Sequence, residues 1–250
     1  DDIGTNGGSI GSTGSVTGRA GTIALAADTL LVDGLGGISS IAGLGAEAPG
    51  AIDISAGLVR VDNGSLISSS SGSSAAMGGE IRISADRLEM GTLATLTSST
   101  FGDGPGGSVI IDAQSVALGM GSEISSRAEE GSTGPGGLVA VTADRLTMQR
   151  SFGLSTETFG SGKAGLIIVE AGEIDVDDST ITSSSESGSG ISGTVTIIGE
   201  TLRVRNGGAI RTNSDNSNAA GGILILADQV DVDGPSEISS ANMSELGRAA

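Results

Sequence analysis

Carboxylates are the most abundant groups in this chain that could perform chemistry. The 250 residues include 30 Asp and Glu against 12 Lys and Arg, with no His and no Cys. The lack of His and Cys excludes Ser-His-Asp and Cys-His catalysis, and it excludes zinc held by imidazole or thiolate. Two kinds of carboxylate chemistry remain, which are glycoside hydrolysis by an acid pair and calcium binding by several oxygens. The formal net charge of −18 disfavours binding to nucleic acid phosphates.

Two adjacent acid pairs are the nearest approach to a hydrolase site. They are Asp177 with Asp178, and Glu129 with Glu130. Neighbouring residues of a strand point to opposite faces, so such a pair cannot flank one glycosidic bond. We therefore expect surface carboxylates here, and the sequence predicts no catalytic residue and no enzyme activity.

One aspartate recurs at equivalent positions of the chain, namely Asp28, Asp86, Asp144 and Asp228. Stacked on one another, these side chains could form a calcium ladder, which needs about six to eight oxygen ligands. Other residue types interrupt the column between them, so near-neighbour carboxylates do not stack. We expect Asx turns instead, in which each carboxylate accepts backbone N–H groups at a corner. No metal site and no cofactor are predicted.

Aromatic and basic side chains are scarce, so the few that occupy matching positions stand out. Phe101 and Phe159 lie at the same place in two loops, two repeats apart. We expect them to pack as caps beneath these loops; the alternative is an exposed pair that a partner or a second rod covers. Arg203 and Arg205 share one strand face, and we interpret them as exposed to solvent rather than as an anion site.

A repeat of 28 to 30 residues organises the whole chain. Each copy starts at a glycine, followed by two apolar columns and an alanine column, each two residues apart. A second alternating apolar pair, a turn, and a third short apolar segment ending in Ser or Thr complete the copy, and a polar loop of variable length leads to the next. The spacing of two is the period of a β-strand. The eight anchoring glycines are Gly21, Gly50, Gly79, Gly107, Gly137, Gly165, Gly193 and Gly221.

This pattern predicts an all-β fold, a right-handed parallel β-helix (β-solenoid) of about eight coils with three short strands per coil. The apolar columns should form inward ladders, and the Ser and Thr that follow the third strand are interpreted as solvated strand edges. Residues 1–20 fit a partial coil and residues 21–248 the eight repeats, so residues 1–250 form one solenoid. Neither end carries a polar cap, so we expect a piece of a longer repeat array or a subunit covered by copies of itself.

The repeats resemble those of a known family. Residues 79–90, with the linking stretches 99–107 and 158–165, resemble the repeats of filamentous-haemagglutinin-like exoproteins, the passengers of bacterial two-partner secretion, in the cyanobacterial style. The resemblance covers residues 21 to about 240. It implies a secreted or cell-surface β-helix that an outer-membrane transporter exports. The secretion domain of that family is not recognisable in this chain.

Together these observations favour a non-catalytic structural or adhesive rod of an extracellular bacterial exoprotein. Its partners would be other copies or flanking coils of the same protein, with cell-surface or matrix polysaccharide as a further partner. Two alternatives remain open, a polysaccharide-binding or polysaccharide-degrading β-helix protein and a self-stacking filament subunit. A carboxylate cluster lying in a groove would favour the first alternative. No stretch of the sequence is apolar enough to span a membrane.

Overall fold

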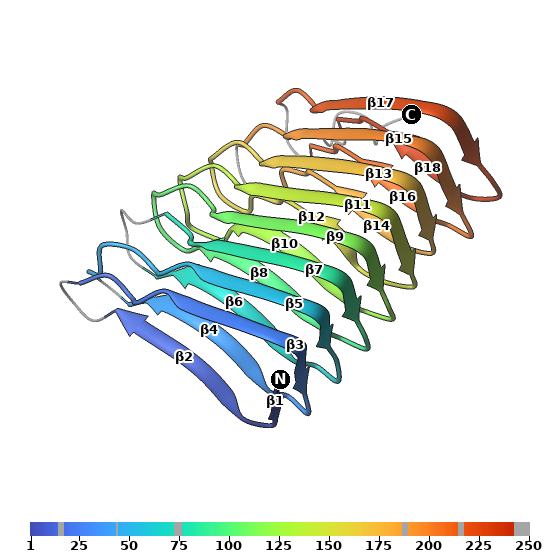
Figure 1. Cartoon of the computed structure of the whole chain (residues 1–250). Coiled ribbons are helices and arrows are strands. Elements are labelled where there is room, and N and C mark those ends of the chain that lie inside the picture. Colours follow the sequence, from blue (N-terminus) through green and yellow to red (C-terminus); the bar gives the residue numbers. More distant parts are fainter. Residues whose placement is uncertain (15–17, 44, 73–76, 187–189, 215–217, 243–250) are drawn as a thin grey trace.

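The fold is an all-β solenoid built from two parallel sheets, as the repeat predicts. A computed structural model describes residues 1–14, 18–43, 45–72, 77–186, 190–214 and 218–242. Each sheet has nine strands, and strands of the two sheets alternate along the chain. In Figure 1 the long strands stack on one another from blue to red, with the short strands behind them. We call one long strand with the short strand that follows it a coil. No helix of the described part is long and apolar enough to cross a membrane.

The long-strand sheet runs the full length of the solenoid. Neighbouring strands pair in parallel and in register, so that Ile81, for example, lies between Ile52 and Val109. Its strands are β1 (Asp2–Asn6), β3 (Ile23–Asp33), β5 (Ile52–Val61), β7 (Glu80–Met90), β9 (Ser108–Leu118), β11 (Leu138–Gln149), β13 (Leu166–Asp177), β15 (Thr194–Arg205) and β17 (Gly222–Val232).

The short-strand sheet forms the opposite wall. It has the same parallel order, and its strands shorten to three residues from β12 onward. Its strands are β2 (Ser9–Gly14), β4 (Gly37–Ala42), β6 (Leu66–Ser71), β8 (Thr95–Thr100), β10 (Glu123–Ala128), β12 (Gly153–Ser155), β14 (Thr180–Thr182), β16 (Ala209–Arg211) and β18 (Glu237–Ser239). Coil 1 is β3 with β4, and coil 8 is β17 with β18.

Two strands form each coil, where the sequence pattern predicts three. The first two expected strands join into a single strand of 10 to 12 residues in the complete coils. The ladder between β5 and β7 pairs Ala56 with Ala85, skips one residue, and resumes at Leu58 with Arg87. The expected break is therefore a bend that interrupts pairing at one position without ending the strand.

The apolar columns form the core, which confirms their predicted inward direction. Ile83, Ile111 and Val141 are stacked on one another and are almost completely buried. The residues between these columns, such as Arg82 and Asp112, are exposed. Burial weakens at both described ends of the stack: Ile3, Ile10 and Leu25 are only partly buried, and Val230 and Val232 of the last coil are 44% and 47% exposed.

The anchoring glycines also stack, and the stacking leaves no space for a side chain. A Cβ atom at Gly137 would lie 1.8 Å from the carbonyl oxygen of Gly107, and one at Gly193 equally close to that of Gly165. These distances are far shorter than a van der Waals contact. Glycine is therefore required at the anchor by the close approach of backbone from the coil before it.

Inner serines of the short strands bind the anchoring glycines, which corrects their interpretation as solvated edges. Ser126 Oγ donates to the Gly107 carbonyl at 2.8 Å, and Ser183 Oγ donates to the Gly165 carbonyl at 2.8 Å. Both side chains are buried. A hydroxyl directed inward is thus paired with the backbone of the same coil, which satisfies two buried polar groups at once.

Candidate functional site

The outer face of the short-strand sheet carries rows of polar side chains along the solenoid. On β6, β8 and β10 these are hydroxyls that bind one another. The Oγ atoms of Ser68 and Ser70 are 2.7 Å apart, and Ser125 Oγ donates to Thr97 Oγ1 at 3.0 Å. This part of the face is uncharged, and its hydrogen-bonding groups are already engaged with one another.

Charged side chains replace the hydroxyls from β10 onward. Glu123 and Arg127 lie on β10, and the bridges between coils place Glu157 of coil 5 beside Arg127. Arg127 Nε donates to Glu157 Oε2 at 3.1 Å, while Arg127 Nη2 donates to Glu123 Oε1. Ser155 Oγ donates to the same Glu123 oxygen at 3.0 Å. One guanidinium therefore holds two carboxylates of different coils.

Glu157 is the carboxyl group whose protonation the fold alters most clearly. Its side chain is only 15% exposed. The pKa of Glu157 is raised to about 7, mainly by burial and also by the charges of Glu123 and Glu186, while the ion pair with Arg127 acts in the opposite direction without cancelling the shift. Glu157 consequently gains or loses its proton near neutral pH.

A groove of about 650 Å³ extends from this cluster across the outer face of β12, β14 and β16. Its lining combines carboxylates, guanidinium groups, hydroxyls, an amide and one aromatic ring. Arg211 on the far side of the groove is ion-paired with Glu237. The lining residues are Glu123, Arg127, Phe152, Ser155, Glu157, Thr180, Thr182, Ser184, Glu186, Arg211 and Asn213.

A tight turn presents Phe152 to this groove. Gly153 follows it with φ of 85°, and a Cβ atom there would lie 1.9 Å from the Thr180 carbonyl oxygen. Only glycine fits this position without strain. The backbone is fixed on both sides of the ring, because Ser151 N donates to Ser179 Oγ at 3.0 Å and Gly153 N donates to the Ser122 carbonyl at 3.2 Å. Phe152 remains 64% exposed.

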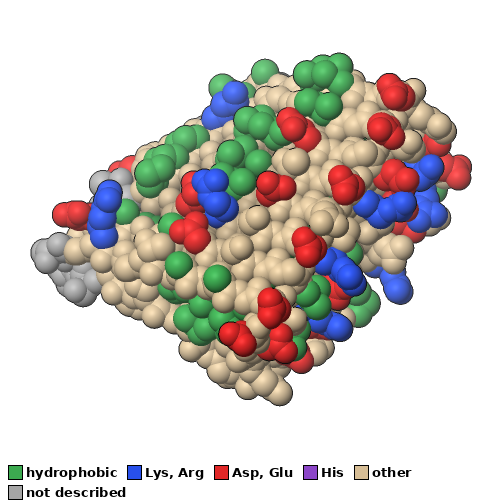
Figure 2. All heavy atoms as spheres, viewed as in Figure 1, with side chains coloured by type: hydrophobic (Ala, Val, Ile, Leu, Met, Phe, Trp, Pro, Cys, Tyr) green, Lys and Arg blue, Asp and Glu red, His purple; other side chains and the backbone are tan. Residues whose placement is uncertain are grey.

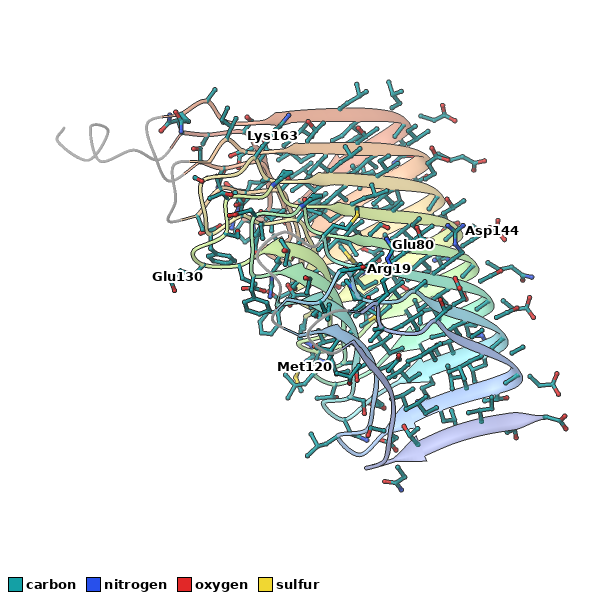
Figure 3. All side chains as sticks on the ribbon, turned by 90° about the vertical axis from the view of Figure 1, so that its left-hand side faces the viewer. Arg19, Glu80, Met120, Glu130, Asp144 and Lys163 are labelled. Carbon is teal, nitrogen blue, oxygen red and sulfur yellow. The ribbon has the colours of Figure 1, made fainter. Side chains whose placement is uncertain are left out.

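The recurrent aspartates are exposed and do not form the expected turns. Asp86 accepts a hydrogen bond from the side chain of Gln114 in the next coil, not from its own backbone. Asp144 lies at the bend of the long strands in Figure 3, with Glu130 on loops at the opposite side. An aspartate binds backbone N–H groups instead at the following corner, where Asp62 Oδ1 accepts from Asn63 N and from Thr92 N of the next coil, both at 2.8 Å. The bend needs no cap because the strand continues through it.

The remaining sequence candidates lie apart from the groove cluster. Asp177 binds Arg205, which also holds Asp175 through two hydrogen bonds of 3.0 and 2.7 Å. Arg205 is therefore partly exposed and ion-paired within the protein, where two arginines simply open to solvent were expected. Arg203 is exposed, as expected. The Glu129 and Glu130 pair lies in the turn after β10.

Phe101 and Phe159 occupy one row of the loops, two coils apart. Backbone hydrogen bonds place Glu129 of the intervening coil between them. Phe101 is 57% exposed, so it does not pack beneath its loop, while Phe159 is half-buried. The expected packing beneath the loops is therefore found only for Phe159, and only in part. Contact of this pair with a partner stays a prediction.

Ion pairs also cover the long-strand sheet. Figure 2 shows acidic and basic side chains lying next to each other on the visible face. Arg82 pairs with Glu80 at 2.7 Å and Arg87 with Glu89 at 3.5 Å, all four being side chains of β7. These side chains are open to solvent, so each pair contributes little to stability.

Glu123, Glu157 and Phe152 were missed by sequence reasoning. The sequence signal that could have found the site is that Glu123 and Arg127 interrupt a segment otherwise rich in Ser and Thr. Arg127 and Glu157 each lie 20 residues after their anchoring glycines, Gly107 and Gly137, so the repeat itself places them at equivalent positions of successive coils.

Comparisons with known proteins assign no role to this groove. Comparison with family models, with curated proteins and with solved structures gave no match. Within the ranges that the structure describes, no group of three or more acidic side chains is arranged to hold a metal ion. The groove is therefore interpreted from its own chemistry.

Proposed function

We propose that this chain is a non-catalytic structural and adhesive rod of a bacterial surface or secreted exoprotein. The observation that carries the proposal is the continuous ladder of the long-strand sheet, in which every strand from β1 to β17 pairs in parallel with the next. Such a stack transmits load through backbone hydrogen bonds and packed apolar columns along its whole length. Loops and the outer faces of the sheets then supply the contacts.

One feature supports the extracellular part of the proposal, and two others are compatible with it. The repeats resemble those of two-partner secretion passengers, which an outer-membrane transporter exports. The chain has no Cys, so its folding does not depend on the redox state of a compartment. Its charge of −18 also keeps a repetitive β protein soluble and limits contact between rods.

Localisation in the source organism tests this proposal. Intact cells should be labelled by an antibody against the folded chain, and protease added outside the cells should remove the epitope while a cytoplasmic marker survives. Any of the protein that is not on intact cells should be found in the washed membranes and the culture medium. An epitope confined to the protease-resistant cytoplasmic fraction would contradict the proposal.

The groove favours a second candidate, a protein that acts on polysaccharide. A carboxylate cluster in a groove is the feature that distinguishes this alternative, and Glu123, Glu157 and Glu186 provide it. Both Glu123 and Glu157 bind the same guanidinium, however, so they lie on one side of any ligand. Hydrolysis needs two carboxylates that flank the scissile bond. The arrangement supports binding better than cleavage.

A further inference from the structure

We propose that the groove lined by Glu123, Arg127, Phe152, Thr182 and Arg211 binds an uncharged oligosaccharide. The inference rests on the adhesive part of the proposed function and names the class of ligand for it. Small-ligand sites combine a concave surface and apolar contact area with a few convergent polar groups. This groove has all three, and its 650 Å³ is within the usual range of such sites.

Phe152 supplies the apolar contact. Its ring is held beside Gly121, since a Cβ atom at Gly121 would lie 3.8 Å from Phe152 Cε2 and 2.7 Å from Leu93 Cδ2. An aromatic ring exposed at the edge of a polar groove offers a flat surface to the C–H face of a pyranose.

The rest of the lining offers both donors and acceptors at short spacing. The hydroxyl oxygens of Thr182 and Ser184 are 2.6 Å apart, and the carboxylates of Glu123 and Glu157 accept hydrogen bonds. The guanidinium groups of Arg127 and Arg211 donate. A sugar hydroxyl donates one hydrogen bond and accepts others, so neighbouring hydroxyls of a pyranose match such a mixed lining.

Charge selects a neutral glycan over an acidic one. Arg127 is already paired with Glu123 and Glu157, and Arg211 is paired with Glu237. Neither guanidinium of the groove is therefore free to neutralise a uronate or sulfate group. The chain as a whole carries −18, which repels polyanions at long range.

The hydroxyl rows of coils 2 to 4 provide an internal comparison on the same face. Ser68 is bonded to Ser70, and Ser125 to Thr97 of the neighbouring coil. A ligand would have to break these bonds to replace them. The hydroxyls of the groove are bonded in the same way, as Thr182 is to Ser184, so the groove differs from these rows in its concave shape, its charged groups and the exposed ring of Phe152.

Isothermal titration with defined hexasaccharides tests the inference on the 250-residue chain. The probes are cellohexaose, xylohexaose, maltohexaose and laminarihexaose, with hexagalacturonate as the acidic comparison. At least one neutral probe should bind, and hexagalacturonate should bind at least ten-fold more weakly. Phe152→Ala should weaken the neutral probe ten-fold or more. Leu35→Ala should leave binding unchanged, because it removes a 79% exposed apolar side chain from the corresponding turn of coil 1, outside the groove.

Three outcomes overturn the inference: no binding of any neutral probe, preference for hexagalacturonate, or equal loss in the Phe152 and Leu35 variants. Thermal melting of both variants verifies that they remain folded; if Phe152→Ala does not fold, Arg211→Gln replaces it, with the same ten-fold loss expected. A chain exposed on the cell surface that binds no neutral probe would leave the rod proposal standing and remove this one. Glycan binding by a protein found only in the cytoplasm would remove the rod proposal alone.

Discussion

Glu157 is the residue whose ionisation should set how the stability of the fold depends on pH. Its pKa is raised from 4.5 to about 7 in the folded chain, mainly by burial. Between these values the folded state keeps a proton that the unfolded state has lost. The free energy of unfolding should therefore fall by up to about 3 kcal/mol as pH rises from about 4.5 to 7. Above pH 7 it should level off.

Glu157→Gln should remove this dependence, because a neutral amide has no proton to lose. Chemical denaturation at pH 5 and pH 8 measures the effect as a change in the free energy of unfolding. Glu130→Gln is the matched control, since Glu130 is exposed. The account would be contradicted if the difference in unfolding free energy between the wild-type chain and Glu157→Gln were the same at pH 5 and at pH 8.

The inner hydroxyl column makes a second prediction about single residues. Ser126 donates to the Gly107 carbonyl, whereas Thr156, at the same position of the next coil, has a buried hydroxyl with no hydrogen-bond partner in the structure. Ser126→Ala should cost about 1 kcal/mol, and Thr156→Val should be neutral or stabilising, because it removes an unsatisfied buried group while keeping the shape. Denaturant midpoints of both variants measure this. Equal losses in the two variants would show that the column does not act through hydrogen bonds.

At the scale of the strands, the repeat predicts most of the fold. The period of two identifies the inward columns in every coil, because an error of one residue would place a whole ladder in solvent. The corner after the alanine column could not be predicted as a bend, since a pause in apolar alternation looks the same whether a strand bends or ends. The structure shows that the strand continues, because Ala85 pairs with Ala113 and Arg87 with Ser115 on the two sides of the bend.

The groove was beyond prediction for a different reason. The repeat places Arg127 and Glu157 at equivalent positions, but the alignment alone does not show that their side chains form an ion pair and that Glu157 is largely buried. The groove also depends on a turn in which Gly153 holds a left-handed conformation and leaves Phe152 exposed. Composition suggested that the chain has almost no aromatic platform, yet one of its three Phe residues lies in the groove.

The core ladder should tolerate no charge. Ile111 is 1% exposed and lies between Ile83 and Val141. Ile111→Asp would bury one unpaired carboxylate in the middle of the apolar ladder, and it should destabilise the fold by several kcal/mol or abolish folding. Ile110→Asp is the control, because the neighbouring position faces outward beside Arg82. Circular dichroism melting compares them, and similar melting of the two variants would mean that the register is wrong.

At the scale of the whole molecule, the described end of the solenoid should drive association. β17 pairs with β15 alone among the described strands, and Val230 and Val232 are half-exposed. An unpaired parallel edge with apolar side chains favours stacking on another copy. Sizing of the isolated chain should show larger species as concentration rises. Val232→Arg should reduce them, and Leu224→Arg, an outward residue of the same strand, should not; a wild-type chain that stays monomeric at high concentration would contradict this expectation.

The most direct test of a non-catalytic rod is a search for turnover. The chain would be incubated with neutral and acidic polysaccharides, with and without calcium, between pH 5 and pH 8, and products would be separated by size. The account predicts no product with any polymer, because Glu123 and Glu157 share Arg127 on one side of the groove and no His or Cys is present. Reproducible product release that Glu157→Gln or Glu123→Gln abolishes would contradict it.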